Sequence, residues 1–473
     1  MLNNNEKMAR DIALIDSSNN YPLYRKLMIF AGLGYTFDAW ATAMIAFILP
    51  IIDSPFNLTG LEEGIIAAST LIGYLVGATF WGLVGDKWGR KNSIQYTLVI
   101  YTIFTLVSAF ASNFSELTIF RIIAGFGIGG ESAVIAPYFS EFIPKKIRGK
   151  YTGYLTGFFS FGFVIAALFG YLMVPIPYIF GLAGWRFATI ISALPVFYII
   201  LMRVSLPESP RWLRLHGKDT AADKVIKKIH GNLDVPKEIY GINSDTYIKD
   251  TIKSLESEHT EGKAHSKFRQ VWSKDYIRRT SMLWVLWFTT GFAYYGFVTY
   301  APTLLVSIGY SIIDSFGIVL LSYIMQIPGY YSAAWLSEHI GRKLLLAVFM
   351  MVGAVTAIIL AYSRALDEII VLYALMSFFL NGLFGAVYIY TPEQYPTSFR
   401  TSGMGFASSF ARVGAIISPI TFGIFLSVIH FSGTFVLTFI IMAIGAVTVL
   451  VLGQETTGKD LEQTSAPQLK GGV

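Results

Sequence analysis

Twelve apolar segments, each long enough to cross a lipid bilayer as a helix, limit what this chain can fold into. The hydrocarbon core of a membrane takes about 20 apolar residues per helical span, and in lipid a segment satisfies its backbone hydrogen bonds within a helix. Composition agrees, because 14% of the residues are charged, whereas about 25% are charged in soluble domains. The segments span about 26–50, 63–84, 93–112, 116–138, 151–174, 185–204, 280–305, 313–335, 344–362, 368–390, 402–427 and 431–452. We therefore expect an all-α membrane protein with twelve transmembrane helices.

Lysines and arginines gather on one side of the expected membrane. If the N-terminus is cytoplasmic, the outer loops contain a single basic residue, Arg364, and the inner segments hold most of the others. Basic residues favour cytoplasmic loops, so we expect a multi-pass protein of the plasma membrane with both termini in the cytoplasm. This placement accounts for the net charge of +6 without nucleic acid. The polar first twenty residues lack the features of a removable signal peptide.

The chain repeats itself at a constant offset of 252 residues, in two separate loops. The matched pairs are Asp86 and Glu338, Gly89 and Gly341, Arg90 and Arg342, Lys91 and Lys343, Glu141 and Glu393, Pro144 and Pro396, and Arg148 and Arg400. Secondary transporters are often built from such repeats, with the substrate site between them near the midplane. The expected organisation is a cytoplasmic tail at 1–25, six-helix halves at 26–204 and 280–453, a cytoplasmic loop at 205–279 and a cytoplasmic tail at 454–473.

Several motifs resemble those of one transporter superfamily. GLVGDKWGRK at Gly82–Lys91 resembles the signature loop of the major facilitator superfamily, and SEHIGRK at Ser337–Lys343 resembles a degenerate copy. IRGK, LPESPRWL and ETTGKDLE are similar to sugar-porter motifs. GIGGE at Gly127–Glu131 and the YTPEQYPTSFRTSGMGF run are similar to the metabolite:proton symporters that include niacin permease and the synaptic-vesicle-related proteins. The resemblance covers essentially the whole chain and implies two pseudo-symmetric six-helix halves that work by alternating access.

The charged residues of the repeated loops lie at the cytoplasmic helix ends. One interpretation is an inner gate, whose ion pairs hold the two halves together when the pore faces outward and separate when it faces inward. The other is a set of ordinary interfacial anchors, and the repeat together with the resemblance favours the gate. The residues are Asp86, Arg90, Glu141, Arg148, Glu338, Arg342, Glu393 and Arg400.

Asp38, Arg121 and Glu131 lie inside apolar segments of the first half. A charge at the centre of a membrane helix costs roughly 2.5–3.5 kcal/mol, so such residues face a partner or a wet cavity. In sugar porters, an aspartate and an arginine at the positions of Asp38 and Arg121 form the proton-coupling pair, and the resemblance implies that pair here; the alternative is a static pair. Glu131 follows Arg121 by about 15 Å of helix, so we expect it not to share the Asp38 site. It remains a candidate second proton station, substrate contact or structural hydrogen-bond partner.

Arg412 is the one charge well inside a helix of the second half, and an unpaired arginine suits a carboxylate ligand. The alternatives are an arginine that extends to the membrane interface or one that pairs with Glu131. Sugar porters carry glutamine and asparagine in their seventh helix and glutamine in their fifth, whereas this chain has aromatic and hydroxyl side chains there. Such residues fit an aromatic metabolite. The expected substrate contacts are Trp40, Tyr294, Tyr295, Asn381 and Arg412.

These features predict a secondary active transporter, a proton-coupled symporter of a small organic carboxylate or aromatic metabolite. A sugar:proton symporter is the alternative, and a non-transporting membrane sensor is a further one. No nucleophile–base constellation indicates an enzyme, the chain has no cysteine, and GFGIGG at Gly125–Gly130 lies in a membrane span, not in a dinucleotide-binding unit. We expect no cofactor and no metal, with the proton as coupling ion. The expected partners are a small-molecule substrate and the bilayer, with no nucleic acid, for a monomeric protein.

Overall fold

The computed structural model describes residues 4–194, 197–198, 205–260, 264–396 and 399–457. Within these residues, twelve helices run along the long axis of an elongated bundle. Each of them begins within six residues of the start of an expected segment. The first half contains α2 (Tyr21–Phe56), α3 (Gly60–Trp88), α4 (Arg90–Ser108), α5 (Phe114–Ser140), α6 (Lys145–Met173) and α7 (Gly184–Ile191). The second half contains α13 (Ile277–Ser307), α14 (Ile312–His339), α15 (Arg342–Tyr362), α16 (Leu366–Glu393), α17 (Arg400–Val428) and α18 (His430–Leu452).

Apolar length accounts for most of this bundle. In the described ranges, nine helices are long and apolar enough to span a membrane by length and composition, and α4, α7 and α13 are not among them. For α7, the described part is eight residues long, and most of the rest of the sixth expected segment lies outside the described residues. The chain of helices nevertheless follows the expected order.

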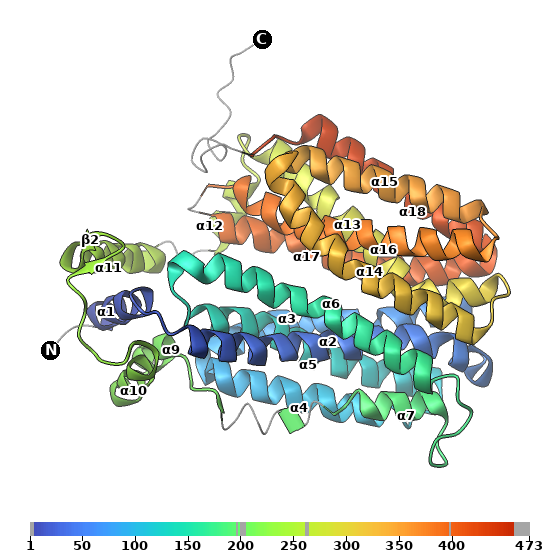
Figure 1. The fold of residues 1–473 in the computed structure, drawn as a ribbon, viewed down its shortest axis with the longest axis horizontal. Coiled ribbons are helices and arrows are strands. Elements are labelled where there is room, and N and C mark those ends of the chain that lie inside the picture. Colours follow the sequence, from blue (N-terminus) through green and yellow to red (C-terminus); the bar gives the residue numbers. More distant parts are fainter. Residues whose placement is uncertain (1–3, 195–196, 199–204, 261–263, 397–398, 458–473) are drawn as a thin grey trace, which may run out of the picture.

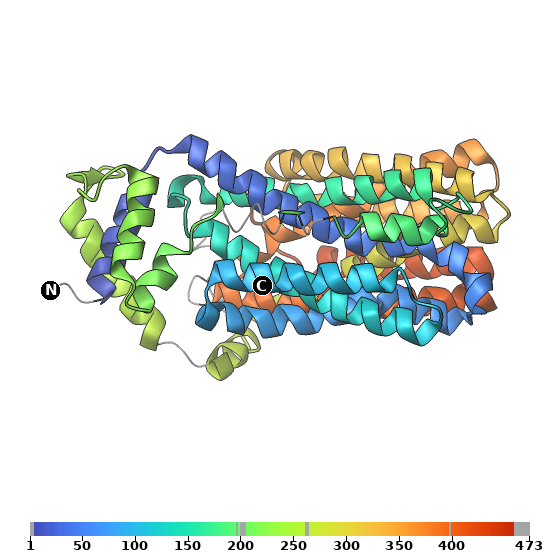
Figure 2. The ribbon, with the colours of Figure 1, turned by 90° about the horizontal axis from the view of Figure 1, so that it is seen from below.

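The two halves lie side by side along the bundle (Figures 1 and 2). Within the first half, α3 and α4 pack on α5, and α2 packs on α6; within the second half, α13 packs on α17, α14 on α16 and α15 on α18. Between the halves, α3 meets α17, α6 meets α14, and α2 meets α13. Small residues allow close packing of membrane helices. Gly125 on α5 is one such residue, because its backbone lies against the carbonyl of Thr70 on α3.

The repeated signature loops have the same structure in both halves. Gly89 and Gly341 adopt positive φ angles of 96° and 90°, which L side chains rarely adopt, and each is the N-cap of the helix that follows the turn. A carboxylate then accepts hydrogen bonds at the start of the new helix. Glu208 accepts from the backbone N–H of Lys91 at 3.1 Å, and Glu455 accepts from that of Arg342 at 2.9 Å. Negative charge is favourable at such helix N-termini.

A group of short elements extends beyond one end of the bundle, at the left of Figure 1. We call it the peripheral module, and it consists of α1 (Asn4–Asp16), α9 (Pro210–Leu215), α10 (Asp219–His230), the antiparallel strands β1 (Glu238–Ile239) and β2 (Ile242–Asn243), and α11 (Ser244–Thr260). Helix α12 (Ala264–Val271) lies against α17. The expected N-terminal tail is thus a helix over most of its length. Its buried residues Met8, Ala9, Leu14 and Ile15 recur at helical spacing and face the module.

Candidate substrate cavity and ionisable residues

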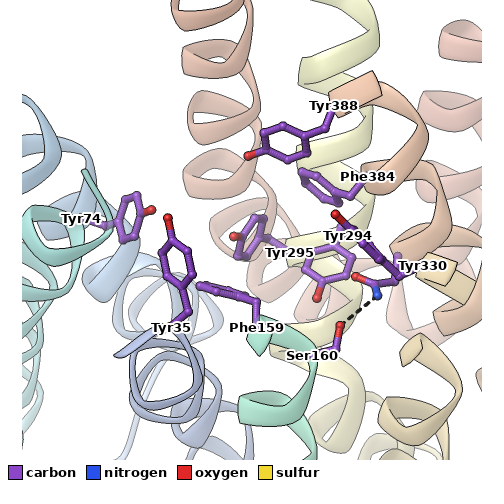
Figure 3. Close-up of a pocket in the computed structure, with 10 residues that line it drawn as sticks. Tyr35, Tyr74, Phe159, Ser160, Tyr294, Tyr295, Tyr330, Phe384 and Tyr388 are labelled. Carbon is purple, nitrogen blue, oxygen red and sulfur yellow. Dashed lines mark hydrogen bonds between the residues drawn. The ribbon is translucent and has the colours of Figure 1, made fainter. Parts of the chain in front are cut away.

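A cavity of about 760 Å³ lies between the two halves. Figure 3 shows aromatic rings reaching it from both halves, with Tyr35, Tyr74 and Phe159 on one side and Tyr295, Phe384 and Tyr388 on the other. Its lining residues are Tyr35 (α2), Tyr74 (α3), Phe159 and Ser160 (α6), Tyr294 and Tyr295 (α13), Tyr330 (α14), and Asn381, Phe384 and Tyr388 (α16).

Arg412 lines a second, adjoining cavity of about 570 Å³, which shares Tyr74, Tyr295 and Tyr388 with the first. The Arg412 guanidinium lies 5.6 Å from the centroid of the Tyr74 ring, a cation–π distance. Its Nη1 donates long hydrogen bonds of 3.3 and 3.4 Å to the Ser408 backbone and hydroxyl oxygens. Over the described residues, no carboxylate forms an ion pair with Arg412, so neither Glu131 nor another acid neutralises it.

A short polar network holds the opposite wall of the first cavity. Asn381 Nδ2 donates to Ser160 Oγ at 3.2 Å, across the two halves, and to the Gln326 carbonyl at 2.8 Å. Tyr294 donates its hydroxyl proton to Gln326 Oε1 at 3.0 Å. Gln326 Nε2 has no acceptor among the described residues. The network therefore fixes the amides while leaving the NH2 group of Gln326 without an acceptor among the described residues.

The structure brings four of the five expected substrate residues to these cavities. Tyr294, Tyr295 and Asn381 line the first and Arg412 the second. Trp40 lines neither of these two cavities, so its role as a substrate contact stays a prediction. Its side chain is 5% exposed and stacks on Phe169 of α6, with ring centroids 4.9 Å apart, so it joins two helices of the same half.

Sequence reasoning missed the rings and hydroxyls that the first half and α14 contribute to the lining: Tyr35, Tyr74, Phe159, Ser160 and Tyr330. It also missed Gln326, which lies behind the lining and bonds to Tyr294 and Asn381. The chain contains 27 tyrosines, and composition does not separate those that face a cavity from those that pack helices. Tyr390, also on α16, illustrates the difference, because it is fully buried and its hydroxyl bonds to the Gln454 carbonyl. The only signal for Gln326 was the presence of an amide inside an apolar segment. Burial of an amide costs free energy unless the amide is hydrogen-bonded.

Asp38 and Glu131 lie beside each other where α2 passes α5. Both side chains are 0% exposed, and Glu131 Oε1 lies against Gly34, one helical turn before Asp38 on the same face of α2. Ser132 Oγ donates to Asp38 Oδ2 at 2.9 Å. The expectation that Glu131 does not share the Asp38 site is therefore wrong. The 15 Å between Arg121 and Glu131 holds along α5, but the register of α2 against α5 places Glu131, not Arg121, opposite Asp38.

Arg121 is 1% exposed, and its Nη1 donates to the Ala41 carbonyl at 3.1 Å. Its Nε and Nη2 meet no acceptor in the described ranges. Ala41 follows Asp38 by three residues, about 4.5 Å along α2, yet Asp38 and Arg121 form no ion pair. The pair implied by the resemblance is thus not made in this conformation.

The charged residues at the end of the first half that faces the peripheral module pair with one another. Arg90 Nη2 lies 2.6 Å from Asp86 Oδ1, and Arg90 Nε lies 3.7 Å from Glu141 Oε1. The second half repeats the arrangement, with Arg342 Nη2 3.1 Å from Glu338 Oε1 and Nε 3.0 Å from Glu393 Oε2. The two remaining arginines donate to nearby backbone carbonyls, Arg148 to Ile143 and Arg400 to Tyr395.

All of these contacts lie within one half. Over the described residues, none of the eight expected gate residues forms an ion pair with the other half. At the opposite end of the bundle the halves touch through their backbones. A Cβ at Gly64 of α3 would lie 2.6 Å from the Cα of Ile420 on α17, and Gly60 lies against the carbonyl of Gly423. The halves are therefore in contact at the end far from the peripheral module, which is the expected outer end, and these charges do not join them at the other end.

Comparisons with known proteins agree with this architecture. The family model described as "Sugar (and other) transporter" matches residues 27–466. The niacin transporter NiaP of Acinetobacter baylyi is 37% identical over 455 residues, which cover 95% of this chain and 99% of the relative. The putative niacin/nicotinamide transporter NiaP of Bacillus subtilis is 33% identical over 439 residues, which cover 93% of this chain and 98% of the relative.

Among solved structures, a partially occluded inward-open form of the Escherichia coli xylose transporter XylE matches with a TM-score of 0.74 at 20% identity. The match covers 92% of this chain and 99% of XylE, and it confirms the expected twelve-helix fold. The relatives are transporters, which confirms that the chain is not an enzyme. The chain therefore belongs to the sugar (and other) transporter family of the major facilitator superfamily, and it is a multi-pass membrane transporter of a small molecule.

Proposed function

We propose that this protein is a proton-coupled symporter of a small aromatic carboxylate. The observation that carries the proposal is Arg412, a cation without an ion-pair partner in the described ranges, beside a cavity lined by tyrosines from both halves. A guanidinium binds a carboxylate through two parallel hydrogen bonds. Aromatic side chains provide flat contact area for a ring, and their hydroxyls orient it.

The names of the relatives support the same class of substrate. Two of them are named as niacin or niacin/nicotinamide transporters, and niacin is a pyridine ring with one carboxylate. In this chain, Arg412 would hold the carboxylate, while Tyr74, Tyr295 and Tyr388 would surround the ring. The protein would act in the plasma membrane as a monomer, with both termini in the cytoplasm, because both halves of the cavity come from one chain.

Alternating access accounts for the contacts at the two ends. Contact between α3 and α17 closes the outer end, and ion pairs confined to each half leave the inner ends free to separate. In the opposite conformation, the same cytoplasmic charges would pair between the halves as an inner gate. A proton bound to buried carboxyls of the first half would drive uptake, so no other cofactor is needed.

Proteoliposomes that enclose a pH-sensitive dye test this proposal. Nicotinate and benzoate should each carry protons inward, whereas nicotinamide, which has the same ring without the carboxylate, should not. Arg412→Ala should abolish uptake, and Arg412→Lys should raise KM about 10–100-fold, since a charge-assisted hydrogen bond contributes about 1.5–3 kcal/mol. Arg364→Ala is the control, because this arginine donates to carbonyls near the end of α15, lies over the Phe431 ring and lines neither cavity. Equal nicotinamide and nicotinate uptake, unaffected by Arg412→Ala, would contradict the proposal.

A sugar:proton symporter remains the second candidate. The buried amides Gln326 and Asn381 beside the cavity favour it, because amides bind sugar hydroxyls. Xylose and glucose are therefore included in the same assay. Proton flux with sugars alone, lost in Gln326→Leu and retained in Arg412→Ala, would establish this candidate instead.

A further inference from the structure

Asp38 and Glu131 form a buried pair of acids without a cation. Glu131 reaches α2 because position 34 is glycine. The Glu131 Oε1 lies against the Gly34 Cα, and a Cβ at position 34 would collide with this oxygen. Gly34 and Asp38 are four residues apart and share one face of α2. The Glu131 carboxyl therefore lies within one helical turn of Asp38, and the next residue of α5, Ser132, donates to Asp38 itself.

The hydrogen bonds around this pair are incomplete. Asp38 Oδ2 accepts from Ser132, but Asp38 Oδ1 and both Glu131 oxygens have no protein donor among the described residues. The ionisable groups that face the pair from the surrounding elements are the hydroxyls of Tyr35, Tyr101 and Tyr198. The nearest cation on α5, Arg121, bonds to Ala41 instead.

Two ionised carboxylates could not remain in this arrangement. Each would lose its hydration on burial without a compensating charge, and the two would repel each other at close range. One proton removes the conflict, because it lowers the charge of the pair from −2 to −1 and makes one carboxyl a donor to the other. That hydrogen bond satisfies oxygens on both residues that otherwise have no donor.

We propose that Asp38 and Glu131 hold one proton between them and act as a single proton-binding site, and that Arg121 is not the counter-ion of Asp38 in this conformation. The step is a simple binding of H⁺ from water by one carboxylate oxygen, with no other bond formed or broken. The role of this site in transport rests on the proton coupling proposed above; its occupancy by one proton does not.

The site is connected to the cavity through one residue. Tyr35 lines the cavity, and its hydroxyl donates to the backbone carbonyl of Ser132 at 3.4 Å. Ser132 in turn donates to Asp38. A substrate that displaces the Tyr35 ring would therefore act on the donor that orients the acid pair. This gives substrate and proton a physical link within the first half.

Counting protons tests the proposal without any transport assay. At pH 7 an exposed carboxyl is ionised, so unfolding the purified protein in strong detergent releases each proton that a buried carboxyl held. Wild type should release one proton more than the double variant Asp38→Asn/Glu131→Gln, whose amides have nearly the same shape. If wild type and the double variant released the same number of protons, both side chains would be ionised in the folded protein. If wild type released two protons more, both would be protonated independently. Either result would overturn the proposal. Asp367→Asn/Glu368→Gln, which removes two exposed acids, should give zero difference.

A second measurement applies if the double variant does not fold. The native state holds a proton that the unfolded chain releases, so wild-type stability should fall as the pH rises and the proton leaves. Glu131→Gln keeps one charge and a hydrogen-bond donor at the site, and should lack this component of the pH dependence of Tm. An unchanged pH dependence in Glu131→Gln would overturn the proposal. Proton flux in liposomes is recorded separately, so a proton count of one without flux would contradict the proposed symport and leave the shared proton intact.

Discussion

Single residues decide which charges meet inside this bundle. Gly34 is a clear case, because the absence of a side chain at this position lets Glu131 approach α2. Arg412 is another, because no acid reaches it among the described residues and tyrosine rings surround it instead. In both cases the neighbours of a residue, more than its type, set the chemistry it can perform.

Gly34→Ala should separate proton binding from substrate binding. The new methyl group would occupy the place of Glu131 Oε1 and move that carboxyl away from Asp38. We expect uphill accumulation to fall at least tenfold while exchange of substrate across the membrane continues, as measured by counterflow. Gly82→Ala on α3 is the matched control, because nothing lies within 4 Å of its Cβ position. Loss of exchange together with accumulation would indicate a general packing defect and contradict this role of Gly34.

The partners of Asp38 show what sequence reasoning could and could not determine at this scale. Burial in an apolar segment identified Asp38, Arg121 and Glu131 as unusual, and the structure buries all three. The spacing of Arg121 and Glu131 along α5 follows from helix geometry. The position of α2 along α5 does not follow from it, because that register depends on side-chain packing between helices. The expected partner was therefore wrong although the residues were identified.

At the scale of elements, apolar length was a sufficient guide to the bundle but not to the module outside it. Helix starts agree with the expected segments because about 20 apolar residues are needed to cross the membrane. Helix α1 was missed, because its 13 residues carry only a short amphipathic stripe within a polar stretch. It is held by partners distant in sequence, including a buried contact of 2.7 Å between Asp11 and Arg214 of α9.

Glu455→Gln should destabilise the start of α15. Burial alone would raise the pKa of Glu455, but the hydrogen bonds it accepts from Thr457, Arg342 and Thr456 lower this pKa below its ordinary value. Its stabilising effect is thus present above the ordinary glutamate pKa and is lost as the pH falls through the lower, folded-state value. We expect a loss of about 1 kcal/mol at neutral pH, measured as a lower Tm in detergent.

The pH dependence distinguishes this cap from a neutral contact. Wild type and Glu455→Gln should approach the same Tm in acid, because protonation removes the charge in wild type as well. Glu368→Gln, at an exposed position in the first turn of α16, serves as control. A difference in Tm that stayed constant from neutral to acid pH would show that the charge of Glu455 does not stabilise the α15 N-terminus.

For the whole molecule, the constant offset of 252 residues made the two-half architecture accessible from sequence. The structure repeats the glycine turn and the carboxylate cap in both halves. The cavity was less accessible, because it is formed by the relative position of the halves, and no periodicity within either half encodes that position. Residues such as Tyr35 and Tyr330 enter it through this packing alone.

Motion of the halves against each other can be tested by linking them at the outer end. A Cβ at Gly60 of α3 would lie 3.0 Å from the Ser427 Cβ of α17, slightly closer than the roughly 3.5–4.5 Å of ordinary disulfides. The chain contains no cysteine, so Gly60→Cys/Ser427→Cys introduces one defined pair without background. Oxidation should lock the outer end closed and reduce uptake to background, and reduction should restore it. Each single variant should be insensitive to oxidant. Since a transporter that alternates access must open this contact in every cycle, full uptake by the oxidised, cross-linked protein would mean that α3 and α17 do not separate, and that substrate enters by another route.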